Sequence, residues 1–250
     1  MAHIQIQGVN LHYPMYGVGQ RSLTSRVAHS LRPGGRVAVE HGHTVVHALR
    51  NISLEITAGD RVALLGHNGA GKSTLIRLIA GIYEPQDGQV RVTGQVTALL
   101  NLALGMDRTA TGYDNIILSG LMHGLDRSEI QAKVKEIARF SELEEFLDMP
   151  LRSYSQGMAM RLAFGIATSI SPDILLLDEW IGAGDRNFLN KVQERMEKII
   201  GESNILVLAT HQLNLLRRFC NKAVLLEKGR MICFGEVEDV IQRYDHAKLS

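Results

Sequence analysis

The amino-acid sequence predicts an α/β protein in which helices cover both faces of a parallel β-sheet. The runs Arg61–Leu65, Ile174–Leu177 and Ile205–Ala209 are almost continuously apolar, which is typical of strands buried on both faces. Helical segments alternate with these strands along the chain, and this alternation indicates parallel pairing. From about Thr111 to Ser169 the pattern is helical, so a helical subdomain interrupts the α/β pattern.

The N-terminal part contains two strands, predicted over Ile4–Val9 and Val45–Ile56. After the apolar strand that ends at Leu65 comes a glycine-rich turn. A helix is then predicted over Lys72–Ala80, and Gly81 fits the position just beyond a helix C-terminus. The sequence therefore predicts a strand, turn and helix in direct succession.

Residue spacing also predicts the helices and strands of the helical subdomain and of the C-terminal part. Ser128 and Gln131 fit a capping box at the start of a helix. Apolar residues then recur at helical spacing at Ile130, Val134, Ile137 and Ala138. Further along, the sequence predicts a helix over Arg186–Ile200 and a hairpin formed by Ala223–Glu227 and Met231–Phe234.

Composition and bulk charge name no partner by themselves, although a local basic patch could exist. The 250 residues carry 27 basic and 26 acidic side chains, so there is no overall basic field that would concentrate nucleic acid. Two cysteines without paired spacing indicate a reducing, cytoplasmic setting. No apolar run approaches the roughly 20 residues of a spanning helix. Any role at a membrane is therefore expected to be peripheral.

The turn before the Lys72–Ala80 helix fits the phosphate-binding loop pattern, in which glycines let backbone N–H groups surround a phosphate. Lys72 would neutralise the β and γ phosphates of a nucleoside triphosphate, and Ser73 would bind Mg²⁺. The alternative is a plain glycine turn before a helix. The expected nucleotide-binding residues of this loop are Gly66, His67, Asn68, Gly69, Ala70, Gly71, Lys72, Ser73 and Thr74.

Two carboxylates, Asp178 and Glu179, follow the apolar strand Ile174–Leu177. Open α/β sheets bind their ligands at the carboxyl ends of the strands. Asp178 would hold Mg²⁺, and Glu179 would activate the attacking water. A solvated strand end is the alternative.

A third segment, Tyr154–Met158, determines the class of nucleotide-binding protein. Ser155 can cap the apolar helix predicted over Met160–Ile170, and the N–H groups at that helix start could bind a phosphate. A plain capped core helix is the alternative. The segment resembles the signature of the ABC (ATP-binding cassette) ATPases, with Ser155 and Gly157 retained.

The resemblance to ABC ATPases covers nearly the whole chain and implies a P-loop NTPase fold. That fold has a RecA-like core over about 1–100 and 171–235, an antiparallel β portion, and a helical subdomain over about 106–170. It also implies that the signature of one subunit closes over the ATP of a second copy in an ATP-sandwich dimer. The remaining site residues that it implies are Tyr13 on adenine, Asp185 in the D-loop and His211 as γ-phosphate sensor. Packing is the alternative for Tyr13, and a structural role is the alternative for His211. The family's glutamine loop falls between Thr97 and Gly105 without a glutamine, and Asn101 is the nearest polar candidate for its Mg²⁺ contact.

Within the family, the segments Tyr154–Phe164 and Asp178–Asp185 resemble ATPase subunits that export lipid-linked O-antigen, capsular polysaccharide or teichoic acid. This implies an integral-membrane permease dimer as partner and a peripheral location at the cytoplasmic face of the inner membrane. The lipid-linked glycan would be handled through the permease, with no nucleic acid involved. Glu236–Ser250 leaves room for one terminal helix and a tail, so the subunit is not expected to recognise the glycan itself.

Alternatives from other classes remain. A soluble ABC ATPase acting on nucleic acid or ribosomes usually carries two cassettes or a long coiled coil, and neither pattern is present. A small-molecule P-loop kinase would leave the Tyr154–Met158 segment unexplained. In the connection 17–43, Leu23, Val27 and Leu31 recur every four residues. This connection could form an amphipathic helix at the permease or lipid boundary, or a surface loop.

Overall fold

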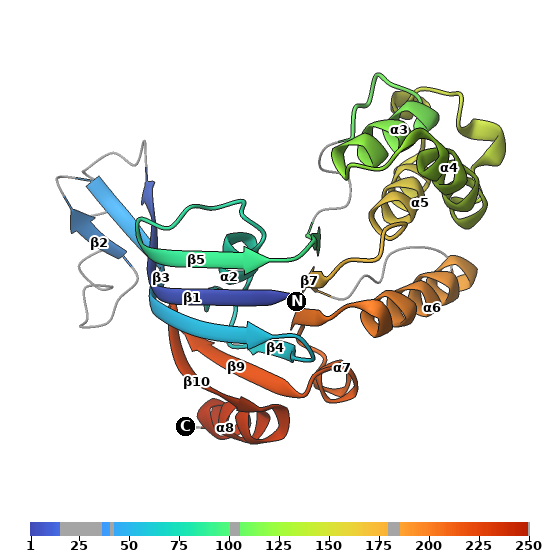
Figure 1. Cartoon of the computed structure of the whole chain (residues 1–250). Helices are drawn as coiled ribbons and strands as arrows, with labels where there is room; N and C mark the ends of the chain where they lie inside the picture. Colours follow the sequence, from blue (N-terminus) through green and yellow to red (C-terminus); the bar gives the residue numbers. More distant parts are fainter. Residues whose placement is uncertain (16–36, 41–42, 101–105, 180–185, 250) are drawn as a thin grey trace. The chain divides into compact units, whose positions relative to one another are not determined.

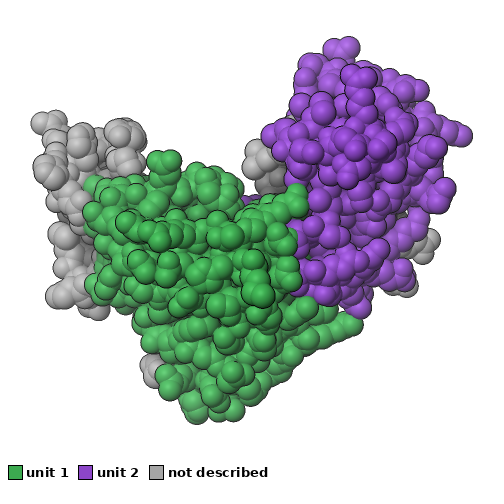
Figure 2. Space-filling model, in the orientation of Figure 1, with its two compact units in different colours: residues 1–98, 173–180, 204–250 green, residues 99–172, 181–203 purple. Residues whose placement is uncertain are grey.

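The computed structural model describes residues 1–15, 37–40, 43–100, 106–179 and 186–249. Contacts divide the chain into two compact units (Figure 2). Unit 1 comprises Met1–Ala98, Asp173–Trp180 and Asn204–Ser250, and unit 2 comprises Leu99–Pro172 and Ile181–Ser203. The phosphate loop and the acidic pair lie in unit 1, and the Ser155 segment lies in unit 2.

A six-stranded sheet in the order β10-β9-β4-β8-β7-β6 forms the centre of unit 1 (Figure 1). Its strands are β4 (Arg61–Leu65), β6 (Val96–Leu99), β7 (Ile174–Asp178), β8 (Ile205–Ala209), β9 (Lys222–Glu227) and β10 (Arg230–Glu236). β4 pairs in parallel with β8 and β9, and β7 pairs in parallel with β8. Every residue of β8 is buried, as expected for a strand covered on both faces. The predicted parallel sheet is confirmed.

The described residues of unit 1 form the helices α2 (Lys72–Ile79), α7 (Leu213–Phe219) and α8 (Val237–Leu249), and α7 contacts α8. α2 contacts β7 and β8, and α8 contacts β4, β9 and β10. Helix α2 and Gly81, which has a φ of 71°, agree with the prediction. α7 was not predicted, because seven residues are too few to establish a helical period.

A second, antiparallel sheet completes unit 1 in the order β2-β3-β1-β5. Its strands are β1 (His3–Met15), β2 (Val37–Glu40), β3 (His43–Thr57) and β5 (Asp87–Thr93). The pairing of β1 with β3 sets Tyr13 opposite Val46. α2 contacts β3 and β5 as well as β7 and β8, so it packs against both sheets. The amphipathic helix predicted around Leu23–Leu31 lies outside the described residues.

Unit 2 is built from helices, as predicted for the subdomain. These are α3 (Gly112–Met122), α4 (Arg127–Ser141), α5 (Gln156–Ala167) and α6 (Arg186–Glu202), with single 3₁₀ turns at Glu144–Phe146 and Leu151–Ser153. The four apolar residues predicted on one face of α4 are all buried. They pack with Leu162 of α5 and with Leu147 and Leu151 from the turns.

The capping box predicted at Ser128 and Gln131 is wrong. Helix α4 begins two residues earlier, with Asp126 as its N-cap, and Glu129 completes the box. The Asp126 carboxylate accepts from the N–H groups of Ser128 and Glu129 at 2.8 and 2.9 Å. The Glu129 carboxylate accepts from the Asp126 N–H at 2.8 Å. Aspartate and glutamate form the same reciprocal pattern as serine and glutamine, so both sets fit the sequence rule.

Helix α6 belongs to unit 2 by its contacts, although the sequence placed 171–235 with the α/β core. Its side chain Arg195 bonds to residues of α4 and of the segment after α5. Among the described helices, none is both long enough and apolar enough to cross a membrane.

Candidate nucleotide-binding site

The backbone of the loop between β4 and α2 needs glycine for two reasons. Gly66, Gly69 and Gly71 have φ values of 144°, 76° and 118°, which residues with a Cβ atom rarely adopt. A Cβ atom on Gly66 would also lie 2.3 Å from the carbonyl oxygen of Leu226 in β9. The loop is therefore seated against the neighbouring strand at a distance that excludes a side chain.

Lys72 opens α2 and is buried, with 8% of its surface exposed. Its Nζ donates to the carbonyl oxygens of Gly66 at 2.7 Å and His67 at 3.2 Å. Burial lowers the pKa of Lys72, and the charges of Glu179 and Asp178 partly oppose that shift. The ammonium group thus spans the loop, at the N-terminus of a helix whose dipole also favours an anion.

The carboxyl ends of β7 and β8 carry the polar groups that face this loop. The Ser73 hydroxyl donates to Oδ1 of Asp178 at 2.9 Å. Glu179 Oε1 lies 3.4 Å from Nε2 of His211, and both side chains are about half exposed, at 54% and 52%. The parallel register that sets Asp178 opposite Ala209 brings Glu179 and His211 to the same edge of the sheet.

Glu179 has a φ of 82°, in a region that disfavours residues other than glycine. Such a conformation costs about 1–3 kcal/mol and persists only where its surroundings hold it. Here the Glu179 N–H donates to the carbonyl oxygen of Ala209 at 2.8 Å. The bond to β8 fixes the direction in which the carboxylate leaves the strand end.

These residues line one pocket of about 390 Å³, formed within unit 1. Its lining residues are Tyr13, Val46, Ala48, Asn68, Gly69, Ala70, Gly71, Lys72, Ser73, Thr74, Asp178, Glu179 and His211. The Tyr13 ring packs edge-on against Tyr83, with centroids 5.5 Å apart. Burial raises the pKa of Tyr13 to about 12, so its phenol is neutral at physiological pH. The pocket lining thus combines an aromatic side chain with charged side chains.

The Tyr154–Met158 segment belongs to unit 2. Tyr154 is buried, and its hydroxyl donates to the carbonyl oxygen of Phe146 at 2.7 Å. The Ser155 hydroxyl accepts from the Met158 N–H at 3.2 Å and caps α5. Ser155, Gln156 and Gly157 are exposed. A buried anchor thus precedes a capped helix start that is open to solvent, although α5 begins at Gln156 and not at Met160 as predicted.

Comparison with protein-family models gives a match over residues 49–182 to the family described as ABC transporter. The match covers more than half of the chain and includes the phosphate loop, the Ser155 segment and the acidic pair. The chain belongs to the ABC transporter ATP-binding family. ABC ATPase domains bind and hydrolyse ATP, so this cassette is an ATPase.

Curated relatives of the cassette include proteins of polysaccharide export. The O-antigen export system ATP-binding protein RfbE of Yersinia enterocolitica is 41% identical over 96% of this chain and all of the relative. The O-antigen export protein RfbB of Myxococcus xanthus is 41% identical over 82% of this chain, which spans 47% of that relative. The teichoic acids export protein TagH of Bacillus cereus is 36% identical over 79% of this chain and 36% of its own length.

Solved structures of cassettes share the fold. An ATP-binding subunit of an ABC transporter superposes with a TM-score of 0.69 at 21% identity, covering 97% of this chain and 93% of that one. A dimeric cassette in a post-hydrolysis state with ADP and Pi gives a TM-score of 0.65 at 20% identity, covering 94% and 98%. At these identities the likeness establishes the fold alone, and it agrees with the predicted P-loop NTPase architecture.

The structure of the cassette brings most of the predicted site residues together. Gly66 and His67 do not line the pocket, although their carbonyl groups hold Lys72. The His67 ring instead faces Tyr244 of α8, with centroids 6.0 Å apart. Ser155 and Gly157 lie in unit 2, while Asn101 and Asp185 lie outside the described residues.

Two lining residues, Val46 and Ala48 of β3, were missed by sequence reasoning. They are ordinary apolar strand residues, and their place in the pocket follows from the register that sets Tyr13 opposite Val46. The sequence shows only that Val46 and Ala48 are two positions apart, so that both lie on the same face of a strand. Without the register, that spacing cannot select one face of the strand.

The oxygen groups of Ser73 and Asp178 in the pocket fit Mg²⁺. The Ser73 hydroxyl and the Asp178 carboxylate are hard oxygen ligands, which this cation prefers. They already lie in contact at 2.9 Å, so the two groups converge on one position beside the phosphate loop. The exposed carboxylate of Glu179 and imidazole of His211 lie at the same strand ends and can accept and donate protons.

Proposed function

We propose that this chain is the ATP-hydrolysing subunit of an ABC exporter that moves a lipid-linked polysaccharide across the cytoplasmic membrane. The observation that carries the proposal is the 41% identity to an O-antigen export protein along that relative's whole length. The teichoic acid export relatives support the same substrate class, a glycan polymer on a lipid carrier. These relatives do not favour the alternative of a soluble cassette acting on nucleic acid or ribosomes.

ATP would lie across the pocket, with adenine near Tyr13 and the phosphates in the loop. The loop N–H groups from Gly69 to Thr74 and the ammonium of Lys72 would hold the β and γ phosphates. Ser73 and Asp178 would hold Mg²⁺, and Asn101 would complete that contact in place of the family's glutamine. When bound, Mg²⁺ would neutralise charge that develops on the phosphate oxygens.

Glu179 would accept the proton of the attacking water. Its carboxylate is exposed at the strand end, beside the loop that holds the phosphates. His211, 3.4 Å away, would contact the γ-phosphate and keep the carboxylate aimed at the water. The backbone bond from Glu179 to Ala209 stabilises this arrangement before ATP arrives.

A second copy of the chain would complete the site. Helix α2 and helix α5 each present an N-terminus suited to an anion. Within one copy they belong to different units, and α5 has its capped start at Ser155 exposed. We propose that Ser155 and Gly157 of one copy contact the ATP held by Lys72 of the other, with Asp185 at the contact between copies.

The membrane step would belong to a separate permease dimer, to which two copies of this chain bind at the cytoplasmic face. Among the described residues, no helix could itself span the bilayer. The subunit would therefore be peripheral, and the lipid-linked glycan would be recognised by the permease. ATP binding and hydrolysis would drive the permease between its inward and outward states.

The test uses the native strain and two matched substitutions. Glu179→Gln should stop export, so that the polysaccharide disappears from the cell surface and its lipid-linked form accumulates inside. Glu55→Gln is the control, because Glu55 makes a similar exposed contact with a histidine, to His3 at 3.0 Å, away from the pocket. Affinity purification from detergent-solubilised membranes should recover a polytopic protein. Recovery with ribosomes or nucleic acid alone, together with normal surface polysaccharide in the Glu179→Gln strain, would contradict the proposal.

A further inference from the structure

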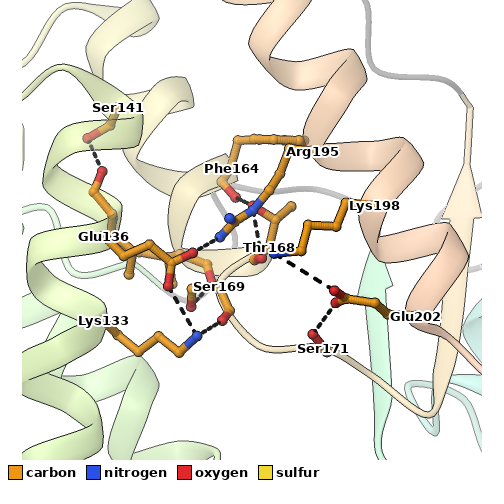
Figure 3. A network of polar contacts seen from close by, with 12 residues as sticks. Lys133, Glu136, Ser141, Phe164, Thr168, Ser169, Ser171, Arg195, Lys198 and Glu202 are labelled. Carbon is orange, nitrogen blue, oxygen red and sulfur yellow. Dashed lines mark hydrogen bonds and ion pairs between the residues drawn. The ribbon is translucent and has the colours of Figure 1, made fainter.

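The C-terminal end of α5 lies inside a network of polar contacts in unit 2 (Figure 3). The last turn of α5 contains no basic residue, so the helix does not itself supply a cation for its free carbonyl groups. Two of its last carbonyl groups each accept a backbone N–H and also a hydroxyl from the residues just after the helix. Thr168 Oγ1 donates to the Phe164 carbonyl at 2.7 Å, and Ser169 Oγ donates to the Ile166 carbonyl at 2.8 Å.

The carbonyl groups of the two residues that follow Ala167, the last residue of α5, accept from cations of other helices. Arg195 of α6 donates through Nε to the carbonyl oxygen of Thr168 at 3.1 Å. Lys133 of α4 donates through Nζ to the carbonyl oxygen of Ser169. Cations at a helix C-terminus stabilise the negative end of its dipole. Two neighbouring helices thus hold the end of α5 together.

Glu136 of α4 joins these two cations into one group. Its carboxylate pairs with the guanidinium of Arg195 and lies 3.2 Å from Nζ of Lys133. Burial would raise the pKa of Glu136, but the bonds from Arg195 and Lys133 outweigh that effect and hold its pKa below the usual value. The Arg195 side chain is only 16% exposed, so its charge is poorly screened by water.

Aromatic rings from three helices pack beside this charged group. The guanidinium carbon of Arg195 lies 5.5 Å from the ring centroid of Phe140 on α4. Phe140 stacks on Phe164 of α5 at 5.6 Å and meets Phe188 of α6 edge-on at 5.5 Å. Arg195 therefore contacts a carboxylate, a helix-end carbonyl and an aromatic face, and a lysine could not match all three directions.

We infer that Arg195 is a positioning residue for the phosphate-contacting end of α5. Ser155 and Thr168 are the residues that flank this helix, so Ser155 lies about 20 Å from the Arg195 contact at 1.5 Å per residue. Leu162 in the core and the buried Tyr154 before the helix start also hold α5, and the contacts of Arg195 fix the tilt of the helix from its other end. Loosening the held end displaces the Ser155 end, which is exposed and has its cap bond within its own first turn.

The inference rests on the proposed function, in which Ser155 of one copy contacts the ATP bound by the other. Arg195 should then affect hydrolysis at the partner's nucleotide and leave ATP binding by its own copy unchanged. Arg195 also lies on α6, the helix that directly follows Asp185, so one side chain links the helices after both segments that would meet the partner copy.

The experiment uses the purified full-length chain with Arg195→Met, which keeps length and apolar contact but removes the charge and donors. ATPase activity should fall on the order of 10²-fold, as for a misplaced reacting group. ATP affinity, measured by calorimetry, should stay within about twofold of wild type. Lys198→Met is the matched control on the same helix, since Lys198 is 65% exposed and lies 3.8 Å from Glu202. Its activity should be unchanged.

Mixing variants distinguishes a positioning role from a general loss of structure. Lys72→Ala removes the phosphate-loop lysine and leaves α5 intact. Mixed with Arg195→Met, it forms heterodimers in which one composite site has a wild-type phosphate loop and a wild-type α5. ATPase activity should therefore return, although each variant alone is nearly inactive. Absence of this rescue would overturn the inference.

A second mixture of two variants, called the calibrating pair, tests the proposed dimer independently of Arg195. Gly157→Asp places a negative charge at the start of α5, where a Cβ atom meets nothing closer than the Ser155 hydroxyl at 3.9 Å. Mixed with Lys72→Ala, it should also restore activity. Failure of the calibrating pair would contradict the composite site itself. If Arg195→Met does not fold, Glu136→Gln should show a smaller loss, also rescued by Lys72→Ala, and the absence of that rescue would equally overturn the inference.

Discussion

Replacement of Glu179 by glutamine changes one oxygen to an amide nitrogen at the strand end of β7. The side chain keeps its shape, and the backbone bond to Ala209 that fixes the strained Glu179 conformation is untouched. Glu179 and His211 are both about half exposed, and such contacts contribute little to stability. The variant should therefore fold like the wild type.

The expected loss lies in the chemical step. Removal of a general base lowers a rate by about 10² to 10⁴, which corresponds to about 2.7–5.4 kcal/mol of activation free energy at 1.36 kcal/mol per tenfold change. ATP affinity should be equal or higher, because the pocket loses one negative charge that faces the phosphates. The variant should thus accumulate as an ATP-bound dimer.

Steady-state ATPase assays measure the first effect, and size-exclusion chromatography with light scattering in ATP and Mg²⁺ measures the second. Glu55→Gln is the control, since it removes a carboxylate from a similar histidine contact elsewhere in unit 1. A Glu179→Gln protein that stays monomeric with ATP and hydrolyses at the wild-type rate would refute both the role of Glu179 and the dimer.

Three further predictions test the phosphate loop, the corrected start of helix α4, and the change in the free energy of unfolding at low pH. Lys72→Ala should weaken ATP binding in calorimetry, because the ammonium group contacts the ground-state phosphates as well as the transition state; unchanged affinity would contradict its placement. Asp126→Ala should lower the free energy of unfolding by about 1 kcal/mol, whereas Ser128→Ala should change it by less than about half of that; the reverse order in urea melts would restore Ser128 as the cap. The pKa of Glu136 is lowered in the folded state, so the unfolded chain binds more protons at acidic pH. The ionised Glu136 carboxylate therefore stabilises the folded state above the unfolded pKa near 4.5. That stabilisation is lost as the pH falls through the folded pKa. The stability gap between wild type and Glu136→Gln should therefore narrow on acidification below pH 4.5, and a gap that widens there would refute the assignment.

The sequence alone determined the local elements of the site. Glycines at 66, 69 and 71 can be read as a phosphate loop because their backbone conformations exclude other residues. Continuous apolar runs predicted the buried strands. Asp178 and His211 follow two of these runs, so both were predicted to lie at the carboxyl ends of strands. Ser155 was predicted as a helix cap because capping depends on atoms within one turn.

Only the tertiary structure decided which of these elements meet. Ser73 and Asp178 are 105 positions apart, and their contact depends on which strands pair in the sheet. The register of β1 with β3 places Val46 beside Tyr13 in the pocket. The bonds of Arg195 to Thr168 and Glu136 depend on how three helices pack. A local pattern fixes the period of an element and the chemistry of its ends, but the free energy that selects its neighbours comes from burial and polar satisfaction across the whole unit.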